Sequence, residues 1–305
     1  MKKVQVLLST YNGEKFIKEQ LTSLANQTYK NIEILVRDDG SKDNTVVILD
    51  DFKKDFPSIE IIKGENVGVK RSFLDLLSLA SEEADYFFFC DQDDFWEKDK
   101  ISSAVSMMEK ENQAIPIMYF SKLKIVDQKL NLLRESPDPE MGIGYENAII
   151  QNIATGCTIG INQAMVSFVK LDLPNPDKIV MHDAWIYLVA AAFGKIIYED
   201  KGHILYRQHD SNAVGMTTSK FSGIQKRYEH FKVERKTKPY TSQAGEFYTK
   251  YENQLDKEKH ALLHDFLFSR QNMFQRWSFL RKTNLYRQTA IDTAIYKICY
   301  LNNWY

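Results

Sequence analysis

The feature that most constrains this chain is an alternation, over its first 115 residues, between short apolar runs and stretches of helical periodicity. Residues 4–8, 32–36, 59–62 and 86–90 are apolar runs of strand length, and segments with one apolar face separate them. The run at 86–90 is apolar throughout, as expected for a strand that is covered on both faces. Repeated strand–helix units of this length predict an α/β fold with a mainly parallel, doubly wound sheet.

The pattern loosens beyond residue 115. We expect strands at 118–120, 123–126 and 195–198, a loop at 135–144, and a helix at 182–193 that Gly194 ends. Beyond residue 220 the periodicity is helical, with aromatic and basic residues interleaved. We therefore predict one large domain over residues 1–219, with halves at about 1–115 and 116–219. A helical region over residues 220–305 follows it.

Composition and charge narrow the class of protein. Hydrophobic residues make up 44% and charged residues 27%, which is typical of a globular protein with a sizeable core. The net charge of −1 argues against a dedicated nucleic-acid binder. Residues 220–305 nevertheless carry 16 Lys and Arg against 8 Asp and Glu, so this region is basic and the rest is acidic. Three widely spaced cysteines and the lack of an apolar run of about 18 residues predict a cytoplasmic protein.

Three polar clusters follow three of the expected strands: Ser9-Thr10-Tyr11-Asn12, Asp38-Asp39-Gly40-Ser41 and Asp91-Gln92-Asp93-Asp94. In a parallel sheet, ligands bind beyond the carboxyl ends of the strands, so these clusters are the candidate site. No G-x-G-x-x-G follows the first strand, and no Walker-type G-x-x-x-x-G-K is present. A dinucleotide oxidoreductase is therefore the least favoured class.

The spacing Asp91-x-Asp93 offers hard oxygen ligands that suit Mg²⁺ or Mn²⁺ bridged to a substrate diphosphate. The alternative is that Asp93 or Asp94 caps the helix that follows. In the other clusters, Tyr11 could stack on a nucleobase and Asp39 could accept a hydrogen bond from the base. An ordinary turn at residues 38–41 and simple packing of Tyr11 are the alternatives.

Taken together, in this order and at this spacing, the three clusters resemble glycosyltransferase family 2, the inverting nucleotide-sugar enzymes of the GT-A fold. Three later motifs resemble the bacterial rhamnosyltransferase-like branch, which builds cell-wall rhamnan and O-antigen-type polysaccharides. They are Thr155-Gly156-Cys157-Thr158, Met181-His182-Asp183-Ala184-Trp185 and Tyr206-Arg207-Gln208-His209. The resemblance covers roughly residues 1–215.

The resemblance implies a role for individual residues. The nucleotide would be held by Ser9, Tyr11, Asp39, Lys70, Arg71 and Asp91, with Lys70 or Arg71 near the diphosphate. The metal would be bound by Asp93, Asp91 and, more loosely matched, His209. The acceptor or sugar would be contacted by Gly156, Cys157, His182 and Trp185. Asp183 matches the catalytic base, and its position at the start of a helix favours the ionised form.

Each of the later assignments has a structural alternative. Asp183 could be a helix N-cap, His182 a packed histidine, and Trp185 a core residue.

The implied function is an inverting transfer of L-rhamnose from dTDP-L-rhamnose to a lipid-linked glycan, with Mg²⁺ or Mn²⁺ on the diphosphate. A UDP-linked galactose or glucose is the alternative donor. A non-catalytic nucleotide- or glycan-binding protein and a metal-dependent phosphatase are the competing classes.

The basic, aromatic region at 220–305 fits helices that lie on the anionic inner leaflet of the membrane, where a lipid-linked acceptor would be found. A helical cap over the catalytic domain and a homodimer interface are the alternatives.

Overall fold

The computed structural model describes residues 1–208 and 235–305, and these fall into two compact units. The first unit comprises residues 1–138, 154–173 and, among the described residues, 194–208. The second comprises residues 139–153, 174–193 and the described residues from 235 onward. The expected domain boundary at residue 219 lies outside the described residues, so this boundary stays a prediction.

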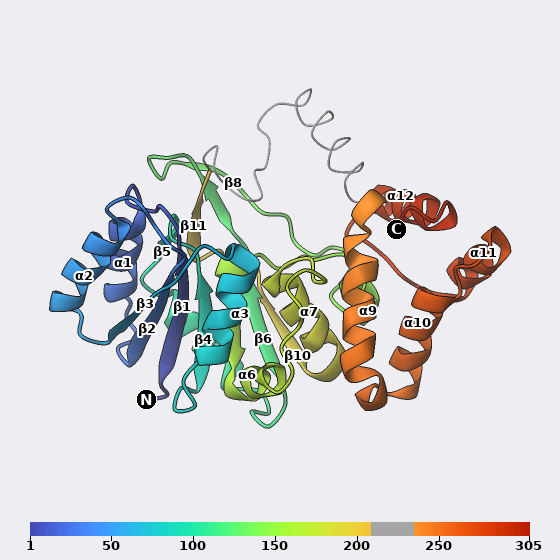
Figure 1. Cartoon of the computed structure of the whole chain (residues 1–305), viewed down its shortest axis with the longest axis horizontal. Helices are drawn as coiled ribbons and strands as arrows, with labels where there is room; N and C mark the ends of the chain where they lie inside the picture. Colours follow the sequence, from blue (N-terminus) through green and yellow to red (C-terminus); the bar gives the residue numbers. More distant parts are fainter. Residues whose placement is uncertain (209–234) are drawn as a thin grey trace. The chain divides into compact units, whose positions relative to one another are not determined.

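A seven-stranded sheet forms the centre of the first unit (Figure 1). Its strands, in sheet order, are β10 (Lys195–Glu199), β6 (Ile117–Ser121), β9 (Gly160–Asn162), β4 (Tyr86–Cys90), β1 (Val4–Thr10), β2 (Ile32–Asp38) and β3 (Ile59–Lys63). All neighbouring pairs are parallel except those of β9, which runs antiparallel to both β4 and β6. The mainly parallel α/β sheet expected from the sequence is confirmed.

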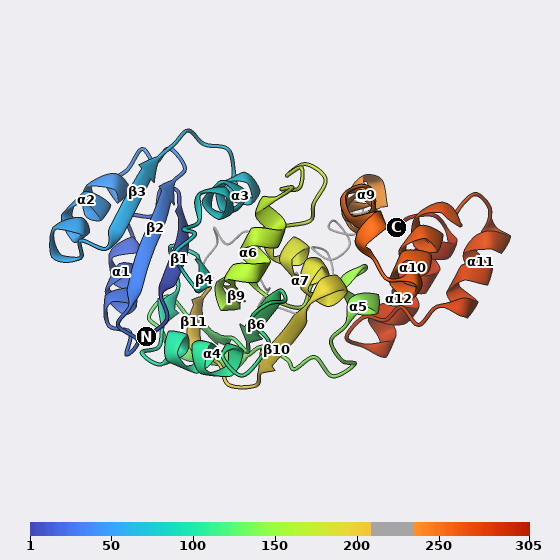
Figure 2. The same cartoon turned by 90° about the horizontal axis from the view of Figure 1, so that it is seen from below.

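Helices cover both faces of this sheet, as Figure 2 shows. One face carries α1 (Ile17–Ala25), α2 (Thr45–Asp55) and α4 (Lys100–Met108), and the other carries α3 (Val69–Leu79) and α6 (Gln163–Lys170). Side chains alternate along β1, so Val6 packs in the core beneath α1 whereas Ser9 faces α3 and contacts Ser72. Burial of both faces explains why β4 has no polar residue.

A second, four-stranded sheet lies in the same unit, in the order β5 (Phe95–Trp96), β11 (Ile204–Arg207), β7 (Lys124–Val126) and β8 (Leu132–Glu135). The sequence pattern does not predict β5 or β8. β5 has only two residues, too few to show a period, and all four residues of β8 are exposed. The pairing of Phe95 with Leu205 brings the end of β11 to the Asp91–Asp94 segment.

The described part of the second unit is helical (Figure 1). Its elements are α5 (Tyr145–Ala148), α7 (His182–Phe193), α9 (Pro239–Tyr251), η2 (Glu252–Gln254), α10 (Lys257–Phe268), α11 (Met273–Lys282) and α12 (Ala290–Leu301). The side chains of Asp256, Asn272 and Thr289 cap the last three helices by accepting a backbone N–H. The helical C-terminal region expected from the sequence is confirmed over these residues. No helix among residues 1–208 and 235–305 is long and apolar enough to span a bilayer.

Candidate functional site

The loops that follow β1 and β4 are joined by one side chain, Gln92. Its Oε1 accepts hydrogen bonds from the Thr10 hydroxyl at 2.6 Å and from the Tyr11 backbone N–H at 2.9 Å. Its Nε2 donates to the Tyr11 carbonyl at 3.1 Å. This role of Gln92 was not predicted from the sequence, although its position between Asp91 and Asp93 was the available signal.

The loop after β2 is joined to the β1 loop in the same way. The Ser41 hydroxyl accepts the Asn12 backbone N–H at 2.8 Å, and the Asn12 side chain accepts the N–H of Lys42 at 2.8 Å. Gly40 has φ +79°, and a Cβ there would lie 3.1 Å from the backbone nitrogen of Asn66. The turn therefore requires glycine, and the three polar clusters form one connected rim at the carboxyl ends of neighbouring strands.

Asp39 is buried in this rim and ties the β2 loop to the segment before α3. Its carboxylate forms an ion pair with Arg37 and accepts the backbone N–H groups of Val67 and Gly68, each at 2.9 Å. Oδ2 accepts from Gly68, and a carboxylate oxygen has room for a second donor. The bond to a nucleobase stays a prediction, and Asp39 also has a structural role that the sequence did not reveal.

The other residues assigned to the nucleotide lie around this rim. Ser9 hydrogen-bonds Ser72 of α3 at 2.7 Å, while Lys70 and Arg71 occupy the first turn of the same helix. Arg71 lies 3.6 Å from Asp75 in an exposed ion pair. The Tyr11 side chain is 42% exposed, so its ring is available for stacking rather than buried in the core. The fold thus brings the start of α3 to the end of β1.

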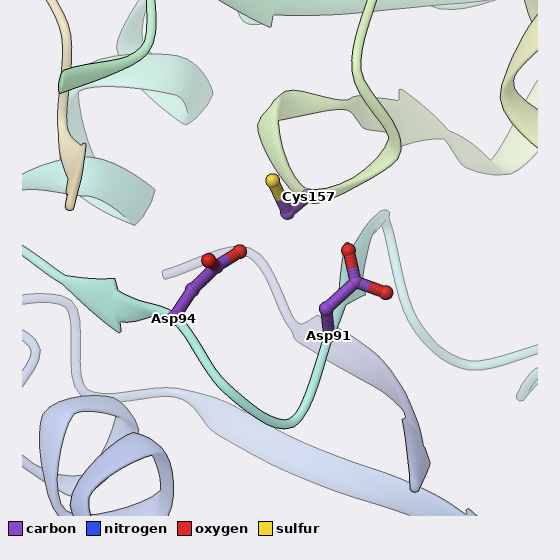
Figure 3. Close-up of side chains that lie close together, drawn as sticks. All are labelled: Asp91, Asp94 and Cys157. Atoms are coloured by element: carbon purple, nitrogen blue, oxygen red, sulfur yellow. The ribbon is translucent and has the colours of Figure 1, made fainter. Parts of the chain in front are cut away.

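Two carboxylates and a thiol gather at the end of β4 (Figure 3). The ligand-capable atoms of Asp91, Asp94 and Cys157 all lie within 4.8 Å of one another. Asp94 and Cys157 are buried, and Asp91 is half-buried. Asp93, assigned to the metal from the sequence, is outside this group of described residues and is also half-buried. His209, the looser metal assignment, lies outside the described residues.

Burial and neighbouring charges raise the pKa of two members of this group, Asp94 and Cys157. Burial raises the pKa of Asp94, and the negative charges of Asp93 and Asp91 raise it further. Burial also raises the pKa of the Cys157 thiol, which hydrogen-bonds Asp94. A protonated thiol donates to the carboxyl, whereas Mg²⁺ and Mn²⁺ select oxygen ligands. Cys157 in η1 (Gly156–Thr158) therefore holds Asp94, and the acceptor contact expected of it stays a prediction.

Arg207, at the end of β11, fixes the acidic segment from its other side. Its backbone N–H donates to Asp94 Oδ1 at 3.3 Å, and its Nε donates to the carbonyl of Asp93 at 3.0 Å. Its guanidinium also pairs with Glu19 of α1. Arg207 belongs to the motif Tyr206-Arg207-Gln208-His209, but its role was not predictable, because the short β5–β11 pairing leaves no pattern in the sequence.

Lys100 is a fully buried lysine close to the same carboxyl groups. Its Nζ lies 3.7 Å from the centre of the Trp96 ring and has no hydrogen-bond partner among the described residues. Burial lowers the pKa of Lys100 to about 8. It was missed, although its spacing of four from Ala104 places it on the inward face of α4.

A second cluster of possible metal ligands consists of Glu97, Asp99 and His203, and it forms a network of ion pairs. Both oxygens of Glu97 contact Lys124, at 2.7 and 2.8 Å. Asp99 lies 2.9 Å from Lys201 and 3.0 Å from His203. Each carboxylate already faces a positive or protonatable group, so this cluster fixes β5 and β11 rather than offering a cation site.

The motif at 181–185 lies in the second unit, at the start of α7. Asp183 is 9% exposed, and its Oδ1 accepts the backbone N–H of Ala184 at 2.6 Å. Burial lowers the pKa of His182 to about 3, so its imidazole is neutral. Trp185 has no exposed surface and packs against Phe247 and Tyr251, with ring centroids 5.6 and 6.0 Å away. The structure corrects the expected sugar contact of Trp185, because its ring is enclosed by the core.

The chain is similar in sequence to known proteins. The family model described as glycosyl transferase family 2 matches residues 5–168. The chain is 33% identical over 227 residues to the dTDP-rhamnosyl transferase RfbG of Shigella flexneri, covering 70% of this chain and 75% of that protein. It is 30% identical over 168 residues to the Escherichia coli protein UDP-Glc:alpha-D-GlcNAc-diphosphoundecaprenol beta-1,3-glucosyltransferase WfgD, covering 54% and 62%.

Solved structures of similar fold cover nearly the whole chain. Residues 1–349 of Staphylococcus aureus TarS in complex with UDP align with a TM-score of 0.59 at 19% identity, covering 99% of this chain and 80% of that one. The mannosyltransferase PcManGT of Pyrobaculum calidifontis, in complex with GDP-Man and Mn²⁺, aligns with a TM-score of 0.54 at 13% identity, covering 99% and 85%. At these identities the likeness supports the fold alone.

Proposed function

This chain belongs to glycosyltransferase family 2, and we propose that it transfers a sugar, with inversion, from a nucleotide diphosphate to a lipid-linked glycan in bacterial cell-surface polysaccharide synthesis. The observation that carries the proposal is the connected rim at the ends of β1, β2 and β4. There Gln92 joins the loop that bears Tyr11 to the acidic segment Asp91–Asp94.

L-Rhamnose from dTDP-L-rhamnose is the proposed donor. The support is the 33% identity to a dTDP-rhamnosyl transferase over 75% of its length. A UDP-linked galactose or glucose is the second candidate, because the name of the Escherichia coli relative gives UDP-Glc as its donor. Both donors present a nucleoside and a diphosphate, so they would use the same rim.

In this proposal the nucleoside is held at the ends of β1 and β2. The exposed ring of Tyr11 stacks on the base, the free lone pair of Asp39 accepts a base N–H, and Ser9 contacts the nucleoside beside them. Lys70 and Arg71, in the first turn of α3, attract the diphosphate with their charges and with the positive end of the helix dipole.

Asp91 and Asp93 would hold a divalent cation, Mg²⁺ or Mn²⁺. The fit rests on the chemistry of the donor set, since both are half-buried oxygen ligands and their charges already raise the pKa of neighbouring Asp94. Such a cation neutralises negative charge on a departing diphosphate. Arg207 and Gln92 hold the backbone of this segment in place.

Asp183 is the proposed general base. It would accept the proton of the acceptor hydroxyl as that oxygen attacks the anomeric carbon and the bond to the diphosphate breaks. Its side chain is held by the N–H of Ala184, and the neighbouring His182 is neutral. Gly156 and His182 remain the proposed acceptor-side residues.

The lipid-linked acceptor would be met at the inner face of the plasma membrane. The support is a set of exposed apolar residues on α11 and α12, among them Phe274, Trp277 and Ile291, next to basic Arg281 and Lys282. Apolar and basic residues on one helix favour an anionic leaflet. A homodimer formed through these helices is the alternative use of the same surface.

The test is a thermal-shift and slow-hydrolysis screen of the full chain against nucleotide sugars, with Mg²⁺, Mn²⁺ or EDTA. A metal-dependent shift and nucleotide release with dTDP-rhamnose alone would support the proposed donor, and a response only to UDP-sugars would replace it. Asp93→Ala should abolish the metal dependence, whereas Asp55→Ala, an exposed acid of α2, should not. Failure to bind any nucleotide sugar would favour the non-catalytic class.

A further inference from the structure

A small cavity of about 50 Å³ lies within the second unit, between the start of α9, helix α12 with the residues before it, and Trp304 and Tyr305. One water-sized group needs roughly 10–15 Å³, so the cavity has room for about three to five such groups. This is the size of a phosphate group with its four oxygens. The residues that line the cavity come from two parts of the chain, residues 235–240 and residues 287–305.

The charge of the lining is positive. Arg235, Lys238 and Arg287 contribute cationic side chains, and none of the described residues that line the cavity is acidic. Aromatic rings orient the two guanidinium groups. Arg235 lies 4.2 Å from the centre of the Trp304 ring, and Arg287 donates to the Tyr305 hydroxyl at 3.0 Å. Guanidinium and ammonium groups donate charge-assisted hydrogen bonds to anions.

Lys238 lies close to other positively charged side chains. Its Nζ donates to the neutral side chain of Asn303 at 3.1 Å. Burial lowers the pKa of Lys238, and the positive charges of Arg270 and Arg276 lower it further. An anion in the cavity would be attracted by these positive charges.

Tyr296 provides a second, independent observation. Its side chain lines the cavity and is 1% exposed, and its hydroxyl has no hydrogen-bond partner among the described residues. Burial raises the pKa of this phenol, so it stays protonated and is a donor. A buried hydroxyl without a partner is costly, and an anion oxygen would satisfy it.

We infer that this cavity is an anion site that binds a phosphate group, with Arg287, Lys238 and Tyr296 as its donors. The inference is independent of the proposed catalytic function, which uses residues of other segments. Phosphate oxygens accept several charge-assisted hydrogen bonds, which this lining offers and which apolar ligands could not use.

The phosphate could belong to a lipid headgroup or to a soluble anion. The lipid source is suggested by Ile295, which lines the cavity and is 48% exposed. It lies on α12 between Ile291 and Ile298, which are also exposed, so the cavity borders an apolar stripe. The experiment therefore has one arm for each source.

In the first arm, inorganic phosphate is titrated into the full chain by calorimetry. Binding should weaken about tenfold or more in Arg287→Gln and Lys238→Gln, and measurably in Tyr296→Phe, which preserves the ring. The control Lys53→Gln, an exposed basic residue of α2 in the first unit, should bind like the unmodified chain. Thermal unfolding establishes that each variant is folded.

In the second arm, the same variants are sedimented with phosphatidylcholine vesicles, with and without phosphatidic acid. Weaker binding of the cavity variants to the acidic vesicles assigns the site to a lipid phosphate. An effect on inorganic phosphate alone assigns it to a soluble anion. If the cavity variants match the control in both arms, or if only Arg71→Gln weakens phosphate binding, the inference is wrong.

Discussion

At the scale of single residues, the sequence assigned chemistry to carboxylates, and the structure adds the polar side chains that hold them. Gln92 and Arg207 each contact the backbone of a site loop, and Cys157 contacts Asp94. None of these three needs to touch a substrate to matter, because each fixes the position of a residue that does.

Asp183→Ala should lower the transfer rate by about 10²–10⁴-fold, the usual contribution of a general base. Nucleotide-sugar binding should change little, because the residues assigned to the nucleotide belong to the first unit. The rate is measured with saturating donor and acceptor, and affinity by thermal shift. Asp177→Ala, an exposed acid of the same unit, is the control. Full activity of Asp183→Ala would contradict the assignment.

Lys100→Met should stabilise the chain at neutral pH. The folded-state pKa of Lys100 is about 8, below its usual 10.5, so the unfolded chain binds this proton more tightly. The resulting cost is complete below about pH 8 and vanishes as the pH rises toward 10.5. We expect a gain in unfolding free energy of roughly 3 kcal/mol at pH 7.

The gain from Lys100→Met should shrink as urea unfolding is repeated at increasing pH between about 8 and 10.5. Lys98→Met, at an exposed position, should show neither the gain nor the pH dependence. A gain that is the same at every pH would mean that Lys100 is not the titrating group.

At the scale of elements, close backbone approaches decide where the sheet can form its edge. Gly194 ends α7 and precedes β10, and a Cβ at this position would lie 2.0 Å from the carbonyl oxygen of Pro116. That same oxygen accepts the N–H of Lys195 at 2.9 Å, which begins the pairing of β10 with β6. The sequence predicted Gly194 as a helix stop, whereas the structure gives it a role in strand pairing.

Gly194→Ala should therefore lower the unfolding free energy by about 1–3 kcal/mol, since the backbone of Pro116 must shift. Gly245→Ala is the matched control, because a Cβ on α9 at that position meets no atom within 4 Å. We expect Gly245→Ala to stabilise the chain by roughly 0.5–1 kcal/mol through helix propensity. Urea unfolding measures both. Equal stability of the two variants would contradict the steric argument.

At the scale of the whole molecule, charge and exposed apolar surface are unevenly distributed. The excess of eight positive charges in residues 220–305 accompanies exposed aromatic side chains on α11, of which Phe274 is 73% and Trp277 46% exposed. Exposed aromatic residues beside basic ones are typical of helices that bind anionic membranes.

The double variant Phe274→Ser with Trp277→Ser should lose most of the binding of the full chain to anionic vesicles. Added salt should weaken the binding that remains, since screening acts on the basic residues. Leu171→Ser removes an apolar residue of the first unit that is more exposed than either of these two and should have no effect. Vesicle sedimentation measures all three proteins. If the double variant instead dissociated a dimer, the surface would be a subunit interface.

The sequence by itself determined the α/β class, the strands β1 to β4 and the three polar clusters at strand ends. These are local properties, since period, chain order and turn residues fix which side chains follow which strand. The pairing of β4 and β2 on either side of β1, which places Asp91 and Asp39 on one rim, was decided by the tertiary structure.

Only the tertiary structure decided what depends on contacts distant in sequence. β5 and β9 are too short to show a period in the sequence. The pairing of β5 with β11 nevertheless places Arg207 beside Asp94, and β9 is the antiparallel strand of the seven-stranded sheet. Burial likewise decided that Trp185 packs in the core and that Lys100 carries a low pKa. Burial is set by neighbours from other segments, which is why a pattern read along the chain could not supply it.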